Sequence, residues 1–367
     1  MPAIPTPLIF WKGGLLSRKA LGCYGQRLLF LSVEYSKSQR RHPGLGAGSP
    51  LSQSGRLIFM QSEALQTPVA LFVFRRPDTT RRVFEAISKV RPTRLLLVAD
   101  GARNDRSGEA EACREVRDIV SQVTWPCEVS TNFAETNLGC QERVISGLNW
   151  VFSLVEEAII LEDDCLPDVS FFPFCQELLE RYRGDNRVAS ITGTNLVEKY
   201  LNTEASYYFS QLGGIWGWAT WKSEWQRYDR HLEDWPKLKD KKMLSELFDH
   251  PKAEAYWTEV FDAMHENRGP NTWDYQWLYT RLKNNSLNIT PSVNLVSNIG
   301  FGFGATHTAE VDSRLIQPAK TIEFPLRHPS SFIPLRSVDH YQLDLNLIPS
   351  FQRVSGKIRR AARRLSL

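Results

Sequence analysis

Short apolar runs alternate with amphipathic stretches from Thr67 onward, and this pattern predicts strands that alternate with helices. The run PVALFVF at 68–74 is almost wholly apolar, as a parallel strand buried on both faces requires. Turn and capping residues follow from Pro77, and the helix that they introduce carries Val83 and Ile87 on one face. The later elements of this half are expected as strands at 94–100, near 127–133 and at 158–164, and as helices near 107–121 and from about 140 to 155.

Strands that alternate with amphipathic helices predict an α/β fold, with a mostly parallel central sheet covered by helices on both faces. Ligands of such sheets bind beyond the carboxyl ends of the strands. After Asp168 the pattern changes to a helix, a short strand at 188–193, an aromatic stretch and further short elements, which predicts a smaller mixed lobe built onto the same sheet. The expected organisation is an N-terminal extension at 1–59, a main domain at 60–320 with halves at 67–165 and 166–320, and a C-terminal extension at 321–367.

The basic residues are concentrated at the two ends of the chain. Residues 1–59 contain eight Lys or Arg and one acid, and residues 353–367 contain six Lys or Arg and no acid. Because the whole chain has a formal charge of +4, these ends of +7 and +6 leave residues 60–352 at about −9. A nucleic-acid-binding protein normally concentrates Lys and Arg on its folded binding face, so this distribution disfavours that class. The basic first segment is compatible with an organelle-targeting peptide or with a dispensable extension.

Cysteine spacing and hydropathy favour a chain without a membrane span in a reducing compartment. The six cysteines form no C-x-x-C pair, which is typical of reduced thiols in a cytosolic protein and disfavours structural zinc. No run approaches the roughly 18 to 20 apolar residues of a membrane span. The tail at 353–367 is compatible with a short basic helix on anionic lipid or with a solvated tail. We therefore expect a cytoplasmic protein, with any membrane contact peripheral and at the inner face.

Three consecutive carboxylates, Glu162, Asp163 and Asp164, follow the apolar run AIIL. Side chains alternate across a strand, so Glu162 and Asp164 are expected on one face and Asp163 on the other if the backbone stays extended. Burying neighbouring acids without compensation is costly, so a cation or a set of donors is expected. Mg²⁺ or Mn²⁺ suits an oxygen-only site and completes its coordination with water and phosphate oxygens, which indicates a diphosphate ligand. The alternative is a solvated acidic turn at a helix start, which the apolar residues on both sides disfavour.

The segment IILEDDCLPDVSFF resembles the acidic strand-end motif of metal-dependent nucleotide-sugar glycosyltransferases with the GT-A fold, most closely the N-acetylglucosaminyltransferase I-like branch. The other motifs that carry the resemblance occur in family order between residues 68 and 308: PVALFVFRRPDTTRRVFEAI, LLLVADG, ERVISGLNWVF, GGIWGWATWKSEW, NTWDYQWLY and NLVSNIGFGFGATHT. The resemblance implies a Rossmann-like GT-A sheet with an acceptor-side lobe. It also implies an inverting transfer of a hexosyl or N-acetylhexosaminyl group from a nucleoside diphosphate sugar to an acceptor hydroxyl, in surface polysaccharide or lipid-linked glycan synthesis.

The resemblance also implies roles for the acids. Asp164 would coordinate the metal, Mn²⁺ or Mg²⁺, with Asp163 and Glu162 placed toward the nucleotide ribose. Asp100, at the end of the second strand, would accept a hydrogen bond from the base. Gly147 departs from the family pattern, because animal relatives have a histidine against the nucleoside there, and this leaves the identity of the base open.

Cationic and aromatic residues complete the implied donor site. Arg76, or its neighbour Arg75, and Arg143 would lie near the nucleotide and favour the diphosphate by charge-assisted hydrogen bonds; the alternative is that they are surface arginines. Gly217 and Trp218 would belong to the donor-sugar pocket, since glycines admit close approach and flat aromatic faces suit sugars. The alternative for the tryptophans of this stretch is a packed aromatic core.

The resemblance places the catalytic base at Asp274, in NTWDYQWLY. An inverting transfer needs one base to take the proton of the acceptor hydroxyl, and a carboxylate does this without a covalent intermediate. The alternative is an aspartate that only begins a helix. His307 would reach back as a second ligand of the metal or the phosphate, although a lone histidine more often has a structural role. The glycines at 300, 302 and 304 indicate a mobile or close-packed loop before it, consistent with a lid that closes on the donor.

Two other classes of protein stay open on the sequence alone. A sugar-nucleotide pyrophosphorylase has a similar sheet and metal chemistry, but it would need a Gly-rich phosphate loop after the first strand, and FRRPDTTRR contains no glycine. A non-catalytic glycan- or nucleotide-binding module is favoured if Asp274 is remote from Asp164.

Overall fold

A computed structural model describes residues 64–300 and 317–345 of the chain. Residues 1–63, 301–316 and 346–367 lie outside the described part, and with them the N-terminal extension, His307 and the basic tail. The expectations for these segments therefore stay predictions. Within the described ranges, no helix combines the length and the apolar character needed to cross a membrane.

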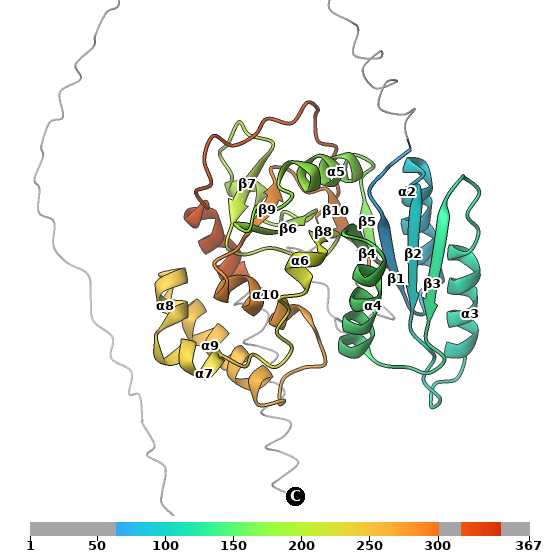
Figure 1. Cartoon of the computed structure of the whole chain (residues 1–367), viewed down its shortest axis with the longest axis horizontal. Helices are drawn as coiled ribbons and strands as arrows, with labels where there is room; N and C mark the ends of the chain where they lie inside the picture. The colour runs from blue at the N-terminus through green and yellow to red at the C-terminus, as the bar shows by residue number, and fades with distance from the viewer. Residues whose placement is uncertain (1–63, 301–316, 346–367) are drawn as a thin grey trace, which may run out of the picture. The chain divides into compact units, whose positions relative to one another are not determined.

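An eight-stranded sheet organises the described part of the chain, in the order β3-β2-β1-β4-β8-β6-β9-β7 (Figure 1). Its first half is parallel throughout, with β1 placed between β2 and β4. The strands of this half are β1 (Val69–Val73), β2 (Arg94–Ala99), β3 (Glu128–Phe133) and β4 (Glu157–Glu162). The carboxyl ends of these strands therefore meet at one edge of the sheet, where ligands of parallel sheets bind.

The second half of the sheet is mixed. Strand β8 (Trp218–Trp221) runs antiparallel to both β4 and β6 (Val188–Thr192). Strand β9 (Leu287–Pro291) runs parallel to β6, and β7 (Tyr207–Ser210) runs antiparallel to β9. The prediction of an α/β fold with a mostly parallel sheet and a mixed second half is confirmed.

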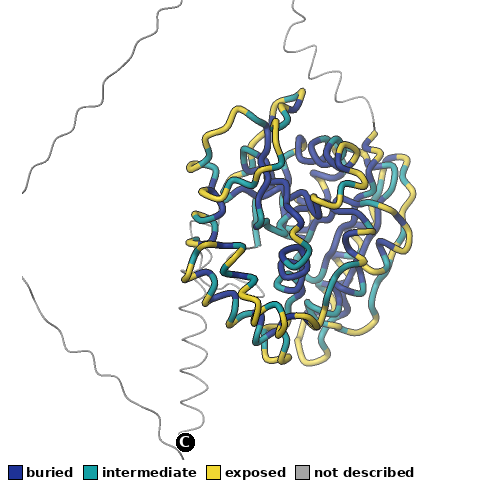
Figure 2. Tube along the Cα trace, turned by 60° about the vertical axis from the view of Figure 1, so that its left-hand side comes forward, coloured by how far each residue is buried: buried dark blue, intermediate teal, exposed yellow. Residues whose placement is uncertain are grey.

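Helices cover both faces of the parallel half. In β1, Val69 and Leu71 belong to one apolar cluster with α2 (Pro77–Val90) and α3 (Glu109–Val120), whereas Ala70 and Phe72 belong to a second cluster with α4 (Cys140–Leu154). This period of two follows from the alternation of side chains along a strand. All five residues of β1 are buried, as the apolar run predicted, and Figure 2 shows buried backbone running through the sheet with exposed residues at the outer turns.

The packing of α4 on the sheet explains Gly147. A Cβ at this position would lie 2.5 Å from Cε1 of Phe72 and 2.7 Å from Cγ1 of Val98, both on the covered face of the sheet. The helix therefore approaches the strands at a point where only glycine fits. Position 147 therefore faces the core of the fold. The expectation that this position corresponds to a family histidine in contact with the nucleoside was wrong.

The second half adds a small ladder and a group of helices. Strand β5 (Cys165–Pro167) pairs antiparallel with β10 (Val296–Asn298). Helices α7, α8 and α9 lie together in Figure 1 and share an apolar cluster with α10. The remaining helices are α5 (Phe171–Arg181), η1 (Glu198–Tyr200), α6 (Lys222–Trp225), α7 (Trp235–Asp240), α8 (Met243–Phe248), α9 (Pro251–His265) and α10 (Asp274–Lys283).

Residues 317–345 pack onto the same body as the sheet. Ile322 and Leu326 are buried in the cluster that contains α5, and the N–H of Leu335 donates to the carbonyl of Phe209 on β7 at 3.0 Å. Residues 336–345 are helical, and Leu343 is fully buried among residues of α8 and α9. The predicted boundary at 320 therefore falls inside a packed segment, and the described part of the C-terminal extension belongs to the main domain.

Candidate active site at the strand ends

The three acids, called the acid cluster below (Glu162, Asp163 and Asp164), lie at the carboxyl end of β4. The strand ends at Glu162, and the chain turns through the two aspartates before β5 begins. Nη1 of Arg76 lies 3.3 Å from Oδ1 of Asp163 and also pairs with Oδ2 of Asp164. The alternation of the three acids was predicted for a backbone that stays extended through Asp164. The extended backbone ends at Glu162, so this condition is not met.

The end of β1 is joined to the acid cluster by backbone as well as by Arg76. The N–H of Phe74 donates to Oδ2 of Asp163 at 3.1 Å, and Phe72 is in register with Glu162 across the parallel pair. Asp163 is buried and receives both this N–H and the Arg76 guanidinium. Arg76, which the sequence assigned to the nucleotide site, is thus placed at the acid cluster.

Electrostatics show that one arginine does not neutralise the acid cluster. Burial raises the pKa of Glu162, and the neighbouring charges of Asp164 and Asp163 raise it further. Burial also raises the pKa of Asp163, although Arg76 opposes this increase. Because desolvation and like charges both disfavour the ionised forms, the acid cluster provides a strong field for an additional cation.

The donor set of the acid cluster bears on the metal that the sequence predicted. It consists of oxygen atoms alone, as Mg²⁺ and Mn²⁺ prefer. Among residues 64–300 and 317–345, no group of three or more His, Cys, Asp or Glu side chains is arranged to hold a metal ion. The acid cluster therefore fits an ion that takes one or two protein carboxylates and obtains its other ligands from water and phosphate. It does not fit a closed site made by protein alone.

Gly300 lies directly against the pair formed by Arg76 and Asp164. The N–H of Ile299 donates to the carbonyl of Asp164 at 2.8 Å, and a Cβ on Gly300 would collide with Oδ2 of Asp164 and lie 2.7 Å from Nη1 of Arg76. The chain after β10 thus passes over the acid cluster with no room for a side chain. This contact agrees with the expectation of a close-packed loop at this glycine.

Asp274 is the first residue of α10 and faces the same region. Thr272 Oγ1 donates a hydrogen bond to Oδ1 of Asp274. The charge of Asp274 acts on Glu162, where it contributes to the raised pKa of that carboxyl. Burial raises the pKa of the Cys140 thiol to about 12, with further contributions from Glu162 and Asp274. The end of β4, the start of α4 and the start of α10 therefore converge.

Hydrogen bonds from α4 hold the segment before Asp274 in place. The N–H of Gln141 donates to Oδ1 of Asn271 at 2.9 Å, and Nε2 of Gln141 donates to the carbonyl of Thr272 at 2.7 Å. Neither Gln141 nor Thr272 was singled out from the sequence. A hydroxyl residue two positions before a helix-starting aspartate is a local signal that could have indicated Thr272, whereas no sequence signal links Gln141 to residue 272.

Gly217 and Trp218 differ in how they relate to the predicted sugar pocket. Gly217 has a φ of 64°, and a Cβ there would lie 2.7 Å from Cγ2 of Val296, so both conformation and space require glycine. Trp218 is 1% exposed, and its ring stacks on Trp273 with centroids 5.5 Å apart. The expectation that Trp218 contacts a donor sugar is corrected: the ring is a core residue, and it supports the residue that precedes Asp274.

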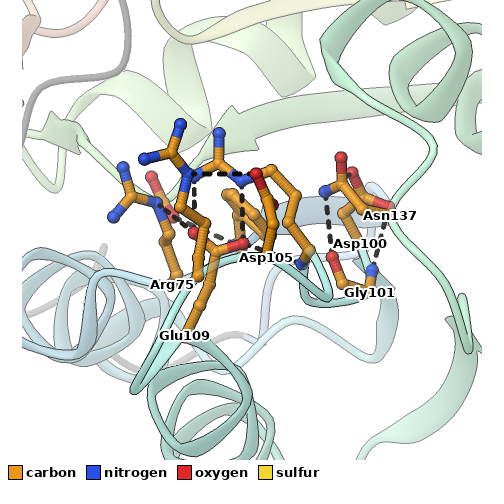
Figure 3. Close-up of polar contacts among 10 residues, drawn as sticks. Arg75, Asp100, Gly101, Asp105, Glu109 and Asn137 are labelled. Carbon is orange, nitrogen blue, oxygen red and sulfur yellow. Dashed lines mark hydrogen bonds and ion pairs between the residues drawn. The ribbon is translucent and has the colours of Figure 1, made fainter.

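The carboxylate of Asp100 accepts hydrogen bonds from neighbouring parts of the chain and has a structural role. Its Oδ1 accepts from the N–H groups of Gly101 and Leu138, both at 2.9 Å, and its Oδ2 accepts from Nδ2 of Asn137 at 2.9 Å and from the N–H of Gly139 at 3.1 Å (Figure 3). A carboxylate offers about four lone-pair positions. The predicted hydrogen bond from a nucleobase therefore has no place here, because the end of β2 uses Asp100 to bind the chain before α4.

Arg143 is likewise held inside the fold. Its Nη2 donates to the carbonyl and to Oδ1 of Asn132 on β3, at 2.6 and 2.9 Å, and the residue is 6% exposed. Burial lowers the pKa of the guanidinium, although the charge of Asp100 opposes this. The predicted contact of Arg143 with a diphosphate is corrected, because the side chain binds β3 from the buried face of α4.

The bracing role of Asp100 predicts a loss of stability in Asp100→Asn. The amide would present a donor to N–H groups that now bind a carboxylate, and each buried donor left unpaired costs about 1–3 kcal/mol. We expect a lower free energy of unfolding in urea than for the native chain. Asp105→Asn, with 77% of the Asp105 side chain exposed in the neighbouring loop, is the control and should unfold like the native chain. Unchanged stability of Asp100→Asn combined with lost nucleotide binding would restore the base-recognition role.

Comparison with known proteins adds little to this geometry. No protein-family model and no curated protein matches the sequence. A solved structure of a UDP-glucose pyrophosphorylase complexed with UDP-glucose is similar over 40% of this chain and 62% of its own, with 13% identity and a TM-score of 0.23, so the chain spans about three fifths of that protein. Mouse xyloside xylosyltransferase 1, in its apo form, is similar over 59% of this chain and 81% of its own, with 10% identity and a TM-score of 0.28. These values are too low to carry an argument about fold or activity.

Proposed function

We propose that the chain is an inverting, metal-dependent glycosyltransferase that moves a sugar from a nucleoside diphosphate sugar to an acceptor hydroxyl. One observation carries the proposal: Gln141, on α4, binds residues 271 and 272 and so holds Asp274, the first residue of α10, at the start of α4. The charge of Asp274 acts there on Glu162, at the carboxyl end of β4. This is the edge of the sheet where ligands of parallel sheets bind. A carboxylate beside an acidic cation site is the arrangement that an inverting transfer requires.

Asp274 acts as the base in this proposal. Its carboxylate takes the proton of the acceptor hydroxyl as the oxygen attacks the anomeric carbon, and the diphosphate leaves from the opposite face. The Thr272 hydroxyl fixes the rotation of the carboxylate by binding Oδ1. Gln141 anchors residue 272 to α4, so the base is held relative to the parallel half of the sheet.

Asp164 would hold the divalent ion, with Arg76 beside it and with Asp163 and Glu162 placed toward the ribose of the nucleotide. The ion, Mn²⁺ or Mg²⁺, supplies positive charge that stabilises the departing diphosphate. Arg76 adds a fixed guanidinium at the same place and suits phosphate oxygens as well as carboxylates. The charge of Asp274 acts on Glu162, the first residue of the acid cluster. A contribution from His307 belongs to the same proposal.

The rival classes find less support in the local structure. Strand β1 ends at Val73 and α2 begins at Pro77, which leaves three connecting residues and no glycine for a phosphate-binding loop of the pyrophosphorylase kind. A non-catalytic module is disfavoured because Asp274 is not remote from the acid cluster. The acceptor that we propose is a glycan or a lipid-linked sugar at the cytoplasmic face of a membrane. That part of the proposal comes from the family resemblance alone.

A donor panel tests the function. The purified chain is incubated with individual nucleotide sugars and Mn²⁺, with and without simple glycoside acceptors, and release of the nucleoside diphosphate is measured with the anomeric configuration of the product. We expect diphosphate release that needs the metal, and a product of inverted configuration. Formation of a nucleoside triphosphate from added pyrophosphate would instead identify a pyrophosphorylase, and a failure of every donor to bind in calorimetry would end the proposal.

A further inference from the structure

A cavity opens on the side of α3, at Arg75, the residue before Arg76. Its volume is about 660 Å³, and its lining includes Arg75, Arg103, Arg106, Ser107 and Glu109. The cavity lies where β1 and β2 end, since Arg75 follows β1 and residues 101–108 connect β2 to α3. Its lining contains three arginines and two acids, Glu109 and Asp105, so the formal charge of the lining is positive, whereas that of the acid cluster is negative.

Glu109 orients two of these arginines. Its side chain is 3% exposed and accepts from the N–H of Arg103 at 2.8 Å and from Nε and Nη2 of the same residue at 2.9 and 2.5 Å. Nε of Arg75 lies 3.3 Å from Oε2 of Glu109, the oxygen that also accepts from Nη2 of Arg103, and Figure 3 labels Arg75 and Glu109. Both guanidinium groups also lie 5.7 Å from the centre of the Phe74 ring. A buried carboxylate and an aromatic ring thus hold the two cations in fixed positions.

The contacts of Arg75 and Arg103 with Glu109 run through Nε of Arg75 and through Nε and Nη2 of Arg103. A guanidinium group carries five N–H donors, more than these contacts use. The side chain of Arg106 is 62% exposed, and its Nε lies 3.8 Å from Oδ2 of Asp105. Guanidinium groups arranged in this way match the oxygens of a phosphoryl group, which binds through paired charge-assisted hydrogen bonds.

The neighbouring residues Arg75 and Arg76 contact different acids, one at this cavity and one at the acid cluster. Arg76 pairs with Asp163 and Asp164, whereas Arg75, one residue earlier, pairs with Glu109 in the cavity wall. We propose that the cavity is a binding site for a phosphoryl group, separate from the acid cluster and independent of any metal. Its occupant is either a phosphate group of a bound nucleotide or free inorganic phosphate. The site does not depend on sugar transfer and would stand if that function failed.

Calorimetric titration with inorganic phosphate in the presence of a chelator tests the site. The chelator removes divalent ions, so phosphate held through a metal at the acid cluster does not contribute. We expect saturable binding to the native chain and to Asp164→Ala. Arg106→Gln should weaken it roughly tenfold, as the loss of one charge-assisted contact implies, and Arg75→Gln should weaken it similarly. Arg114→Gln, an exposed arginine further along α3, is the matched control and should bind like the native chain.

The source of the phosphate is decided by repeating the titration with saturating nucleoside diphosphate. If nucleoside diphosphate competes with inorganic phosphate for the native chain but not for Arg106→Gln, the site binds a phosphate of the nucleotide. If nucleoside diphosphate leaves phosphate binding unchanged, the site binds free phosphate. Both results support the site. The proposal is overturned if phosphate binding is not saturable, or if Arg75→Gln and Arg106→Gln bind phosphate as tightly as the native chain. Arg106 makes no buried contact, so loss of fold does not confuse this variant.

Discussion

Asp274→Asn should lower the rate of sugar transfer by about 10³-fold and leave donor binding within about twofold of the native value, because general-base catalysis contributes about 10² to 10⁴. The amide keeps the shape of the carboxylate, and its oxygen can still accept from Thr272. It cannot take a proton from the acceptor hydroxyl. Transfer is measured as glycoside formed at saturating donor and acceptor, and donor binding is measured by calorimetry with Mn²⁺.

Asp249→Asn is the matched control for this experiment. Asp249 ends α8 at a φ of 46°, is exposed, and asparagine tolerates that backbone as well as aspartate does. The control should therefore keep both transfer and binding. If Asp274→Asn transfers sugar at the native rate, Asp274 only begins a helix and the base lies elsewhere. If it loses donor binding together with transfer, the side chain belongs to the donor site and not to the acceptor.

Asp164→Ala should weaken Mn²⁺-dependent donor binding by at least about 100-fold, since even residues that only orient metal ligands contribute about 10- to 100-fold to metal affinity. The change removes one of the two carboxylates that face Arg76 and leaves Arg76 with Asp163 at 3.3 Å. The Arg76 charge would then neutralise much of the remaining acid. Mn²⁺ uptake is measured by electron paramagnetic resonance in the presence and absence of nucleoside diphosphate, so the result does not rest on activity alone.

Glu156→Ala provides the comparison for Asp164→Ala. Glu156 lies just before β4, at the end of the strand opposite to the acid cluster, and its side chain is 82% exposed beside Lys222. The control should take up Mn²⁺ like the native chain. Equal Mn²⁺ uptake and equal donor affinity in Asp164→Ala and in the native chain would contradict the placement of an ion at Asp164.

The first half of the fold could be predicted closely because its elements follow local rules. Turn and capping residues from Pro77 and apolar residues at helical spacing identified α2, and the predicted ends of α4 and β1 lie within one residue of those observed. The acids at the end of β4 were found for the same reason. The extended backbone that their alternation requires ends at Glu162, which the sequence did not indicate, because the next strand, β5, pairs with β10, more than 100 residues further along the chain.

Site residues were predicted less well where long-range partners decide the role. An aspartate at a strand end is compatible with both a ligand contact and a structural brace. Three of the donors that bind Asp100, the side-chain amide of Asn137 and the N–H groups of Leu138 and Gly139, come from residues 37 to 39 positions later. Arg143 and Trp218 were assigned to the donor site because of their chemical type. Both are buried, and Arg143 binds Asn132 whereas Trp218 stacks on Trp273. Glu109 and Arg103 were not identified, because nothing in their spacing indicates a shared cavity.

The hydrogen bonds of Gln141 with residues 271 and 272 have a practical consequence for protein engineering. A chimera that exchanges the second half to change the acceptor would also exchange residues 271 and 272, through which α4 holds Asp274, the proposed base. Such a chimera should keep Asn271 and Thr272 together with Gln141 of the recipient. Without these residues the new lobe would fold correctly but would place the carboxylate of residue 274 in the wrong position relative to the anomeric carbon.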